Sequence, residues 1–426
     1  MTPPVHPTGP DTRRARWSWR DTAVVVGIVA AGIGAAWALP HGTPADETAS
    51  TTPGYVTEPV TYPVEIPGCD EVGPPPKRDT GFGWTAYGAS SGYSDPDFPW
   101  LTATKATAMT DALRGALPPD VEVRFDAPSR MLVFQPIFRI NPDTIPDGAD
   151  VGGSSEARGT LLRAGSAGRL DASVREWNRP VPACVAGELD ERRTLPDGTV
   201  VDVLDTWSEL RGTRTLARAA TAYPPDGSRV IASLTDQAGS SGDGGAAHSG
   251  ALPLTVDELA AIAADPGLRT TTAVPAGTAP ARMDCGGGVE PMGDPLDRGD
   301  VDRLAAALTM AWAALGPLAA TPDRPVGSVE VAGSARDAAC LELALSGPAG
   351  AGRLGVTIAV NTSAPEEFTA ADALPDGTRV RTTTDEGTTW VTAVRPSGTA
   401  VTVTLSGAGP TPEQLVALAT APGLDL

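Results

Sequence analysis

The chain contains two copies of one helical segment, and this internal repeat limits the fold more than any other feature of the sequence. Residues 255–268 read TVDELAAIAADPGL and residues 411–424 read TPEQLVALATAPGL, so seven of fourteen positions are identical at an offset of 156. In each copy Thr is followed three residues later by Glu or Gln, which is the capping-box pattern that begins a helix. The repeat therefore predicts one helix at the end of each of two related halves.

Shorter matches occur in the same order in both halves. The matched pairs are 121–123 with 329–331, 168–170 with 352–354, 195–199 with 374–378, and 225–227 with 396–398. One match this short carries no weight, but their common order indicates a duplication with different loop lengths in the two copies.

Each half reads as a helix, several strands and a closing helix. Apolar residues at helical spacing predict opening helices at 101–117 and 300–315. Apolar residues alternate with smaller or polar ones over 354–360, which is typical of a half-buried antiparallel strand, and the Pro-x-Gly turns favour hairpins. The fold class that we predict is α+β, with two tandem related domains, each a mainly antiparallel sheet flanked by helices.

The N-terminal region predicts a membrane anchor. Residues 22–39 are 18 consecutive uncharged residues, and a helix of that length rises about 27 Å, close to a hydrocarbon thickness of about 30 Å. Arginines precede this segment and acidic residues are the first charges after it, so residues 1–21 are expected in the cytoplasm and the C-terminal region outside the cell. The alternative is a cleaved secretory signal, because Ala36 and Ala38 suit a signal peptidase. The apolar run exceeds a signal core of about 7–15 residues, which favours the uncleaved single-pass anchor.

The exported part divides into segments of different composition. Residues 40–68 are rich in Pro and Thr and have no apolar periodicity, so they read as a semi-extended spacer. We place the first repeat at 69–269, a Pro/Gly-rich linker at 270–284 and the second repeat at 285–426.

Composition excludes several classes of function. The chain has 52 acidic and 32 basic residues, a net charge of −20, and so carries no charge footprint for nucleic acid. Its two lysines, Lys77 and Lys105, do not follow a Gly-rich loop, which excludes a P-loop nucleotide site. We therefore expect neither a nucleic-acid partner nor a cofactor. The Ala-, Gly-, Pro- and Arg-rich, Lys-poor composition is typical of a GC-rich bacterial genome, so the exported part is expected in the bacterial cell envelope.

The four cysteines predict two structural disulfides. They all follow the apolar segment, on the side of a membrane where disulfides persist. Four cysteines allow three connectivities. Pairing within each repeat, Cys69–Cys184 and Cys285–Cys340, needs no bond across the linker and is the connectivity that we predict. Their spacings match neither a zinc site nor a CxxC redox centre.

A search for catalytic and metal-binding motifs finds little. HExxH and SxxK are absent from the sequence, and His248 lies in a Gly/Ser-rich segment where we expect no packed residue to hold it as a general base. The acidic segment 141–150 lacks the ligand spacing of a calcium loop, so no metal site is expected.

One segment is unusually rich in aromatic residues. Residues 82–100 hold six of the chain's 20 aromatic side chains, interleaved with Gly, Ser and Asp. Rings beside carboxylates suit a sugar, a peptide or a cationic ligand. The residues expected to form such a ligand site are Trp84, Tyr87, Tyr93, Asp95, Asp97 and Trp100. The alternative is that these rings cover a sheet edge or fill the junction between the two copies.

These features favour a non-catalytic, membrane-anchored binding or sensor-type protein whose partner is an envelope protein, a small molecule or a glycan. One alternative is a cell-wall glycosidase that uses the carboxylate pair Asp95 and Asp97. A second alternative is a structural scaffold of an envelope complex, which would bury the aromatic rings against its own sheet.

Overall fold

The computed structural model of the protein describes nine stretches of the chain. They are residues 62–75, 88–90, 92–140, 153–210, 213–238, 247–286, 293–318, 320–360 and 372–426. All of them belong to one compact unit, Glu58–Leu426. The predicted cytoplasmic tail and the anchor at 22–39 lie outside the described residues. Among the helices that are described, none has the length and apolar character needed to span a membrane.

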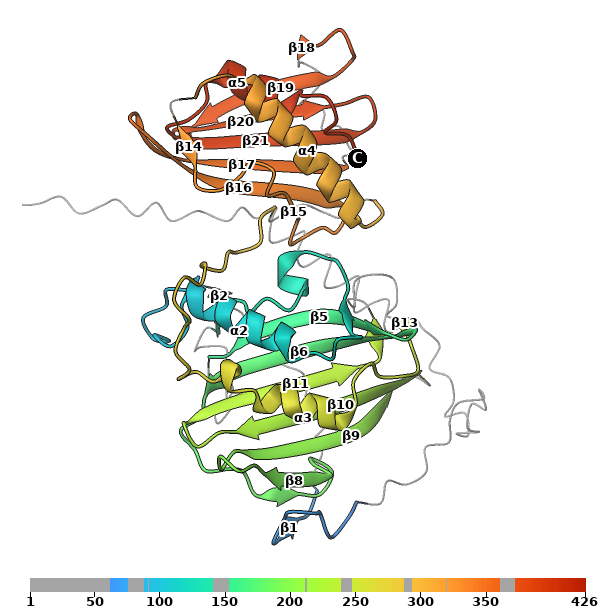
Figure 1. Ribbon diagram of the computed structural model, residues 1–426. Helices are drawn as coiled ribbons and strands as arrows, with labels where there is room; N and C mark the ends of the chain where they lie inside the picture. The colour runs from blue at the N-terminus through green and yellow to red at the C-terminus, as the bar shows by residue number, and fades with distance from the viewer. Residues whose placement is uncertain are drawn as a thin grey trace, which may run out of the picture. The chain divides into compact units, whose positions relative to one another are not determined.

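Two antiparallel sheets with few helices make up this mixed α/β structure (Figure 1). The first sheet has the order β3 (Glu122–Val123), β5 (Ser155–Arg163), β6 (Ser166–Glu176), β11 (Ser228–Thr235), β10 (Thr213–Tyr223), β9 (Val200–Leu210), β8 (Glu191–Thr194). Its helices are α2 (Ala103–Gly115) and α3 (Val256–Ala264).

The second sheet has the order β14 (Thr321–Pro322), β16 (Ala338–Gly347), β17 (Gly350–Val360), β21 (Thr399–Gly407), β20 (Thr388–Val394), β19 (Arg379–Asp385), β18 (Asp372–Ala373), and β15 (Glu330–Val331) also pairs with β16. Its helices are α4 (Arg298–Ala314) and α5 (Pro412–Ala419). In both sheets the first long hairpin, β5–β6 or β16–β17, lies beside the last strand of that sheet in chain order, β11 or β21. The preceding strands then follow in reverse order.

Three short strand pairs lie outside these sheets. They are β1 (Val72–Gly73) with β7 (Cys184–Val185), β2 (Gly88–Ser90) with β4 (Phe138–Ile140), and β12 (Gln237–Ala238) with β13 (Ala247–His248).

The closing helices α3 and α5 begin where the capping-box pattern predicts. Thr255 and Glu258 form a reciprocal capping box at α3, and Thr411 and Gln414 form one at α5. Each satisfies backbone N–H groups that the first turn of a helix leaves without a partner. The expected opening helices are confirmed as α2 and α4.

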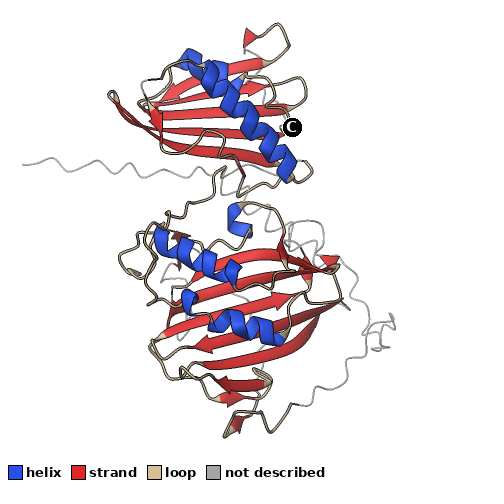
Figure 2. Cartoon of the chain, in the orientation of Figure 1, coloured by secondary structure: helices blue, strands red, loops and turns tan. Residues whose placement is uncertain are grey.

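The helices of each sheet cover one of its faces (Figure 2). Met109 and Leu113 of α2 and Leu259 and Ile262 of α3 are fully buried against alternate residues of the first sheet. Leu304, Leu308, Leu415 and Leu418 do the same for the second sheet. Burial of one face by helices explains why these strands alternate apolar and polar residues.

The opposite face of the first sheet stays partly exposed. Along β6, Leu170, Ala172 and Val174 are buried, while the residues between them are only half-buried. Arg169 and Arg175 lie on this face, which carries no described helix, and it is called the open face below.

One stretch after β3 packs away from the first core. Ala127 is completely buried in the core of the second sheet, and Phe125 packs against the same cluster. The side chain of Arg336, next to β16, forms an ion pair with Asp126 at 3.0 Å. The predicted boundary at 270–284 stays a prediction, but these three residues link the two halves well before it in the sequence.

Candidate functional site

The aromatic segment contributes rings to the core of the first sheet. Tyr93 is 8% exposed, and its hydroxyl donates a hydrogen bond to the carbonyl oxygen of Phe134 at 2.8 Å. Trp100 is half-buried and packs against the same core. Trp84 and Tyr87 lie outside the described residues. The described rings therefore support the fold, and a ligand site formed by the whole segment stays a prediction.

The two carboxylates of this segment lie in one tight turn. Asp95 is 5% exposed, and its Oδ1 accepts a hydrogen bond from the Asp97 backbone N–H at 3.0 Å. The Asp95 carbonyl accepts from Phe98 N–H, while the Asp97 side chain is exposed. This is the local hydrogen bonding by which Asp commonly stabilises a turn.

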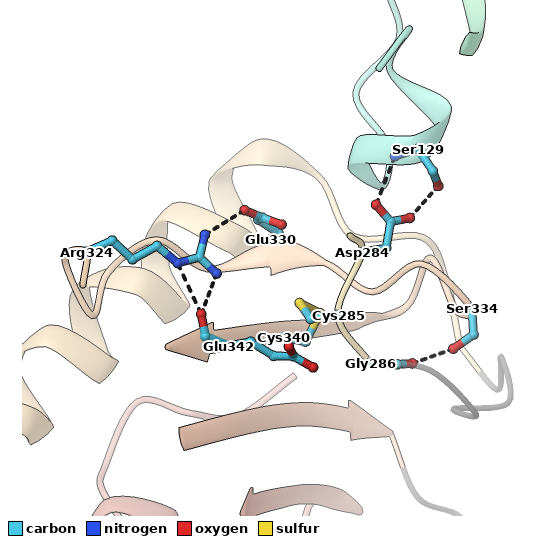
Figure 3. The surroundings of a disulfide bond; sticks show 9 residues. All are labelled: Ser129, Asp284, Cys285, Gly286, Arg324, Glu330, Ser334, Cys340 and Glu342. Carbon is cyan, nitrogen blue, oxygen red and sulfur yellow. Dashed lines mark hydrogen bonds and ion pairs between the residues drawn. A yellow bond between two sulfur atoms is a disulfide. The ribbon is translucent and has the colours of Figure 1, made fainter. Parts of the chain in front are cut away.

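Both predicted disulfides are confirmed, as Cys69–Cys184 and Cys285–Cys340. Cys285 and Cys340 are almost completely buried among alanines next to β16. Figure 3 shows the neighbouring Asp284, whose carboxylate accepts hydrogen bonds from the backbone N–H and the hydroxyl of Ser129. Burial raises the pKa of the Asp284 carboxyl. Burial, and to a smaller extent the Asp284 charge, also raises the pKa of the Tyr93 hydroxyl.

Other contacts around this bridge also join backbone to side chains. The Ser334 hydroxyl donates to the Gly286 carbonyl at 2.6 Å, and the guanidinium of Arg324 donates to the Glu342 carbonyl and to the Glu330 carboxylate. Each of these polar groups has its hydrogen-bond partner within the fold. The contacts around this bridge therefore serve to stabilise the structure.

His248 is held more firmly than its sequence context predicts. Its Nδ1 lies 3.3 Å from Oδ1 of Asp236, which is 1% exposed and also accepts a hydrogen bond from Leu216 N–H. The expectation that no packed residue holds His248 is wrong, because β12 and β13 bring it back beside the end of β11. Among the described residues, no set of three His, Cys, Asp or Glu is arranged to hold a metal ion.

A group of basic and aromatic side chains lies on the open face of the first sheet. Trp177 follows β6 directly, and three arginines lie near its ring. The guanidinium carbons of Arg175, Arg179 and Arg229 are 5.0, 5.5 and 4.7 Å from the indole centroid. The ring of Tyr223 is tilted at 55° with its centroid 5.9 Å away. These five residues are called the Trp177 cluster.

Two of these arginines are cross-strand neighbours on adjacent strands of the sheet. Arg175 on β6 and Arg229 on β11 are directly opposed in the antiparallel register. Like charges in directly opposed positions destabilise a sheet. Stacking on Trp177 offsets part of this cost through cation–π attraction, which contributes about 0.5–2 kcal/mol per contact depending on solvation.

The backbone around Trp177 is fixed in place. The Trp177 N–H donates to the Gly227 carbonyl at 2.6 Å, and the indole N–H donates to the Pro180 carbonyl at 3.3 Å. Arg192 donates to the Pro182 carbonyl, and the loop ends at the Cys184 bridge. The indole is therefore held with its faces towards the arginines.

Among the described residues, one acidic side chain beside the cluster is already paired. Arg192 forms a two-point ion pair with Asp202, at 2.6 and 2.8 Å. Burial raises the pKa of the Tyr223 hydroxyl, against the opposing charge of Arg229, with Asp202 and Glu188 contributing in the same direction as burial.

The sequence contains part of this signal. Arg175, Trp177 and Arg179 are spaced by two, which places them on one face of an extended chain. The contribution of Arg229 and Tyr223 depends on strand register and could not be predicted from sequence spacing.

Comparison with protein-family models, curated proteins and solved structures finds no match to this chain.

Proposed function

We propose that this chain is a non-catalytic, single-pass membrane-anchored protein that binds a ligand in the bacterial cell envelope. The proposed binding surface is the open face of the first sheet at the Trp177 cluster. The observation that carries the proposal is the convergence of three guanidinium groups on one half-buried indole, on a sheet face without a described helix.

The placement of the chain rests on its cysteines and its N-terminal sequence. Two disulfides are consistent with an oxidising compartment outside the cytoplasm. Residues 22–39 would supply the anchor, residues 1–21 the cytoplasmic tail, and residues 40–68 a spacer that keeps the folded part away from the bilayer.

The two sheets would then be tandem related domains that arose by duplication. Supporting this, the turns at 195–199 and 374–378 share their hydrogen bonds as well as their sequence. In each turn the leading Leu N–H donates to the closing Thr carbonyl, Leu195 to Thr199 and Leu374 to Thr378. The equivalent strand order of the two sheets points the same way.

A scaffold of an envelope complex is the second candidate, and one observation favours it. Tyr93 is buried against its own sheet, which is what a scaffold requires of the aromatic segment. We do not propose the glycosidase. Asp95 and Asp97 share a single tight turn, and Asp95 is occupied by the Asp97 N–H in the role of a turn-forming side chain.

Retention on isolated envelope material tests binding against scaffolding. The full-length protein with Trp177→Ala should be released from wall and membrane fractions at lower salt than the wild type, while Trp100→Ala should not be. Equal release of the two variants would favour the scaffold. Recovery of the wild type from the cytosol, or with four reduced cysteines, would contradict the proposed placement.

A further inference from the structure

We propose that the second sheet carries a binding surface for a neutral glycan, on the face opposite its helices. Helices α4 and α5 pack on one face of this sheet (Figure 2). The other face carries no described helix, and Trp390 projects from it, so it is called the Trp390 face below. This surface is separate from the Trp177 cluster, and the inference therefore goes beyond the proposed function and does not depend on it.

Strand register places the side chains of the Trp390 face in rows across β16, β17, β21, β20 and β19. Directly opposed residues of an antiparallel pair lie on the same face of a sheet. The middle row is Glu342, Gly355, Thr404, Trp390 and Thr383. The rows beside it are Cys340, Thr357, Thr402, Thr392 and Arg381, and Ala344, Arg353, Ser406, Thr388 and Asp385. Most of these side chains are hydroxyls, whereas the residues between them in β17 and β21 are apolar and buried in the core.

Trp390 supplies an exposed aromatic ring to this hydroxyl-rich face. The residue is 36% exposed, and its neighbours in the middle row, Thr404 and Thr383, are too short to cover the indole. A sugar ring presents C–H groups on its faces and hydroxyls around its edge. The slightly positive C–H groups are attracted to the negative face of an aromatic ring. An exposed indole bordered by hydroxyls therefore matches both parts of a sugar.

The threonine hydroxyls beside the indole keep hydrogen-bonding capacity for a ligand. The hydroxyls of Thr392 and Thr402 lie 3.2 Å apart, and the Thr404 hydroxyl donates to the Gly355 carbonyl at 3.5 Å. A hydroxyl donates one hydrogen bond and accepts two, so these contacts use only part of the capacity of each group. Adjacent strands lie about 4.8 Å apart, which spreads the hydroxyls over an area large enough for more than one sugar ring.

The charge of the Trp390 face favours an uncharged ligand. Its charged residues are Glu342, Arg353, Arg381 and Asp385, whose formal charges sum to zero and which lie at its border. The centre of the face is uncharged, although the chain as a whole has a net charge of −20. A neutral glycan is complementary to such a centre. A second copy of this chain would bring a further charge of −20 and would be repelled.

The surface is built on ordered elements. The central strands β17, β21 and β20 are each paired on both sides, and Cys340 in one outer row is fixed by its disulfide to Cys285. Threonine is branched at Cβ and has few side-chain conformations to lose. Binding therefore orders little, which removes one of the usual costs of association.

Saturation-transfer NMR titrations on the full-length protein in phosphatidylcholine nanodiscs test the proposal. The neutral probes are cellohexaose, mannohexaose and arabinohexaose, which differ in ring type and in the orientation of their hydroxyls, and hexagalacturonate is the charged probe. At least one neutral probe should bind saturably, and Trp390→Ala should weaken that binding by about tenfold or more. Trp207→Ala is the matched control, because Trp207 is 37% exposed and lies on a strand of the first sheet. It should bind the probe as the wild type does.

Two neighbouring threonines of β19 separate the face from a general effect on the strand. Both are exposed, but Thr383 is opposed to Trp390, whereas Thr382 is opposed to the buried Val391 and so lies on the other face. Valine keeps the shape of threonine and removes the hydroxyl. Thr383→Val should weaken glycan binding by about three- to tenfold, the effect of one lost hydrogen bond. Thr382→Val should leave it unchanged.

Several outcomes would overturn the proposal. They are the absence of saturable binding by all three neutral probes, tighter binding of hexagalacturonate than of any neutral probe, and equal losses in Trp390→Ala and Trp207→Ala or in Thr383→Val and Thr382→Val. Self-association that is lost in Trp390→Ala, without glycan binding, would assign the face to a second copy of the chain instead.

Trp177→Ala distinguishes this inference from the proposed function. It should bind the neutral probe as the wild type does, because Trp177 belongs to the other sheet. Envelope retention that depends on Trp177, without binding of any neutral probe, would leave the proposed function standing and this inference wrong. Glycan binding that depends on Trp390, with envelope retention that does not depend on Trp177, would support this inference and contradict the binding surface proposed above.

Discussion

Asp284 accepts two hydrogen bonds from Ser129, one from its backbone N–H at 3.0 Å and one from its hydroxyl. Ser129 lies in the turn that follows β3, and Asp284 directly precedes the bridged Cys285. A contact between residues so distant in the chain joins the two halves at a covalently fixed point. It also places a carboxylate in partly desolvated surroundings, which leads to the first prediction.

Stability should depend on the ionisation of Asp284. Its folded-state pKa is raised above the ordinary 3.8 by burial, so the folded chain holds this proton more tightly than the unfolded chain does. The contribution of this group to stability is therefore largest at low pH and decreases as the pH rises above 3.8 through the folded pKa. Asp284→Asn should abolish that decrease. The measurement is the melting temperature of both proteins over a range of pH, and the wild type should lose its advantage over the variant as the pH rises.

Matched substitutions separate charge from hydrogen bonding at this contact. Asn accepts from the Ser129 N–H and donates to its hydroxyl, so Asp284→Asn should cost less than about 1 kcal/mol at neutral pH. Ser129→Ala leaves a carboxylate with one donor fewer and should cost about 1–3 kcal/mol. A larger loss in Asp284→Asn than in Ser129→Ala would contradict this assignment.

Lys105 should titrate at an unusually low pH. It is 3% exposed, and its ammonium donates to the carbonyl oxygens of Arg269 and Thr272 at 2.7 and 2.5 Å. Burial lowers its pKa to about 8, against a smaller opposing effect of Asp226. Because the unfolded chain then binds this proton more tightly, stability should rise as the pH increases from about 8 towards 10.5.

Lys105→Met should lose that rise and should be less stable at pH 7. The carbonyl groups of Arg269 and Thr272 would each lose the hydrogen bond from Lys105, which costs about 1–3 kcal/mol of stability per group. Removal of the buried charge offsets part of this cost. Chemical denaturation of both proteins at several pH values measures the difference. Thr104→Ala, on the same helix, is the control. If the free energy of unfolding depended on pH in the same way in the wild type and in Lys105→Met, the lowered pKa of Lys105 would be contradicted.

The two matching turns should respond equally to one substitution. Gly198 and Gly377 have φ of +83° and +85°, a left-handed conformation, and each lies next to the equivalent proline, Pro225 or Pro396. Alanine at either position should cost about 1–2 kcal/mol. Gly115, which has open space around it and no positive φ, should tolerate alanine. Thermal unfolding of the three variants tests whether the two halves share this element.

The two disulfides should be reduced in a fixed order. Cys69 is half-buried, whereas Cys285 and Cys340 are 4% and 1% exposed. Exchange requires access of a thiolate to sulfur. Under native conditions dithiothreitol should open Cys69–Cys184 first, as followed by alkylation and mass spectrometry of the peptides. Loss of either bridge should lower stability by about 2–4 kcal/mol. Earlier alkylation of Cys285 would contradict the order.

Local features of the fold could be predicted from the sequence, because their causes are local. The capping boxes at Thr255 and Thr411, the apolar stripe of α2 and the alternation along β17 each follow from residues a few positions apart. The disulfide pairing could be predicted because each bridge falls within one half.

The candidate site could be predicted only in part, because strand register is not local. The spacing of Arg175, Trp177 and Arg179 is visible in the chain, but the opposition of Arg175 to Arg229 depends on how β6 and β11 pair. The same holds for Asp236, which reaches His248 across a hairpin. Tyr93 is among the residues expected from the sequence to bind a ligand, but it is buried in the core. Composition does not show whether a ring points outward or into the core.

The first bridge has a mechanical consequence. Cys69 lies just after the Pro67–Gly68 turn, its partner Cys184 closes the Trp177 loop, and the Pro67 carbonyl accepts a hydrogen bond from Arg192 N–H on β8. Tension applied through the preceding chain thus enters the fold at a covalent crosslink. The short β1–β7 pairing cannot be peeled open by that pull while the bridge is intact, and the load passes into the loop that carries Trp177.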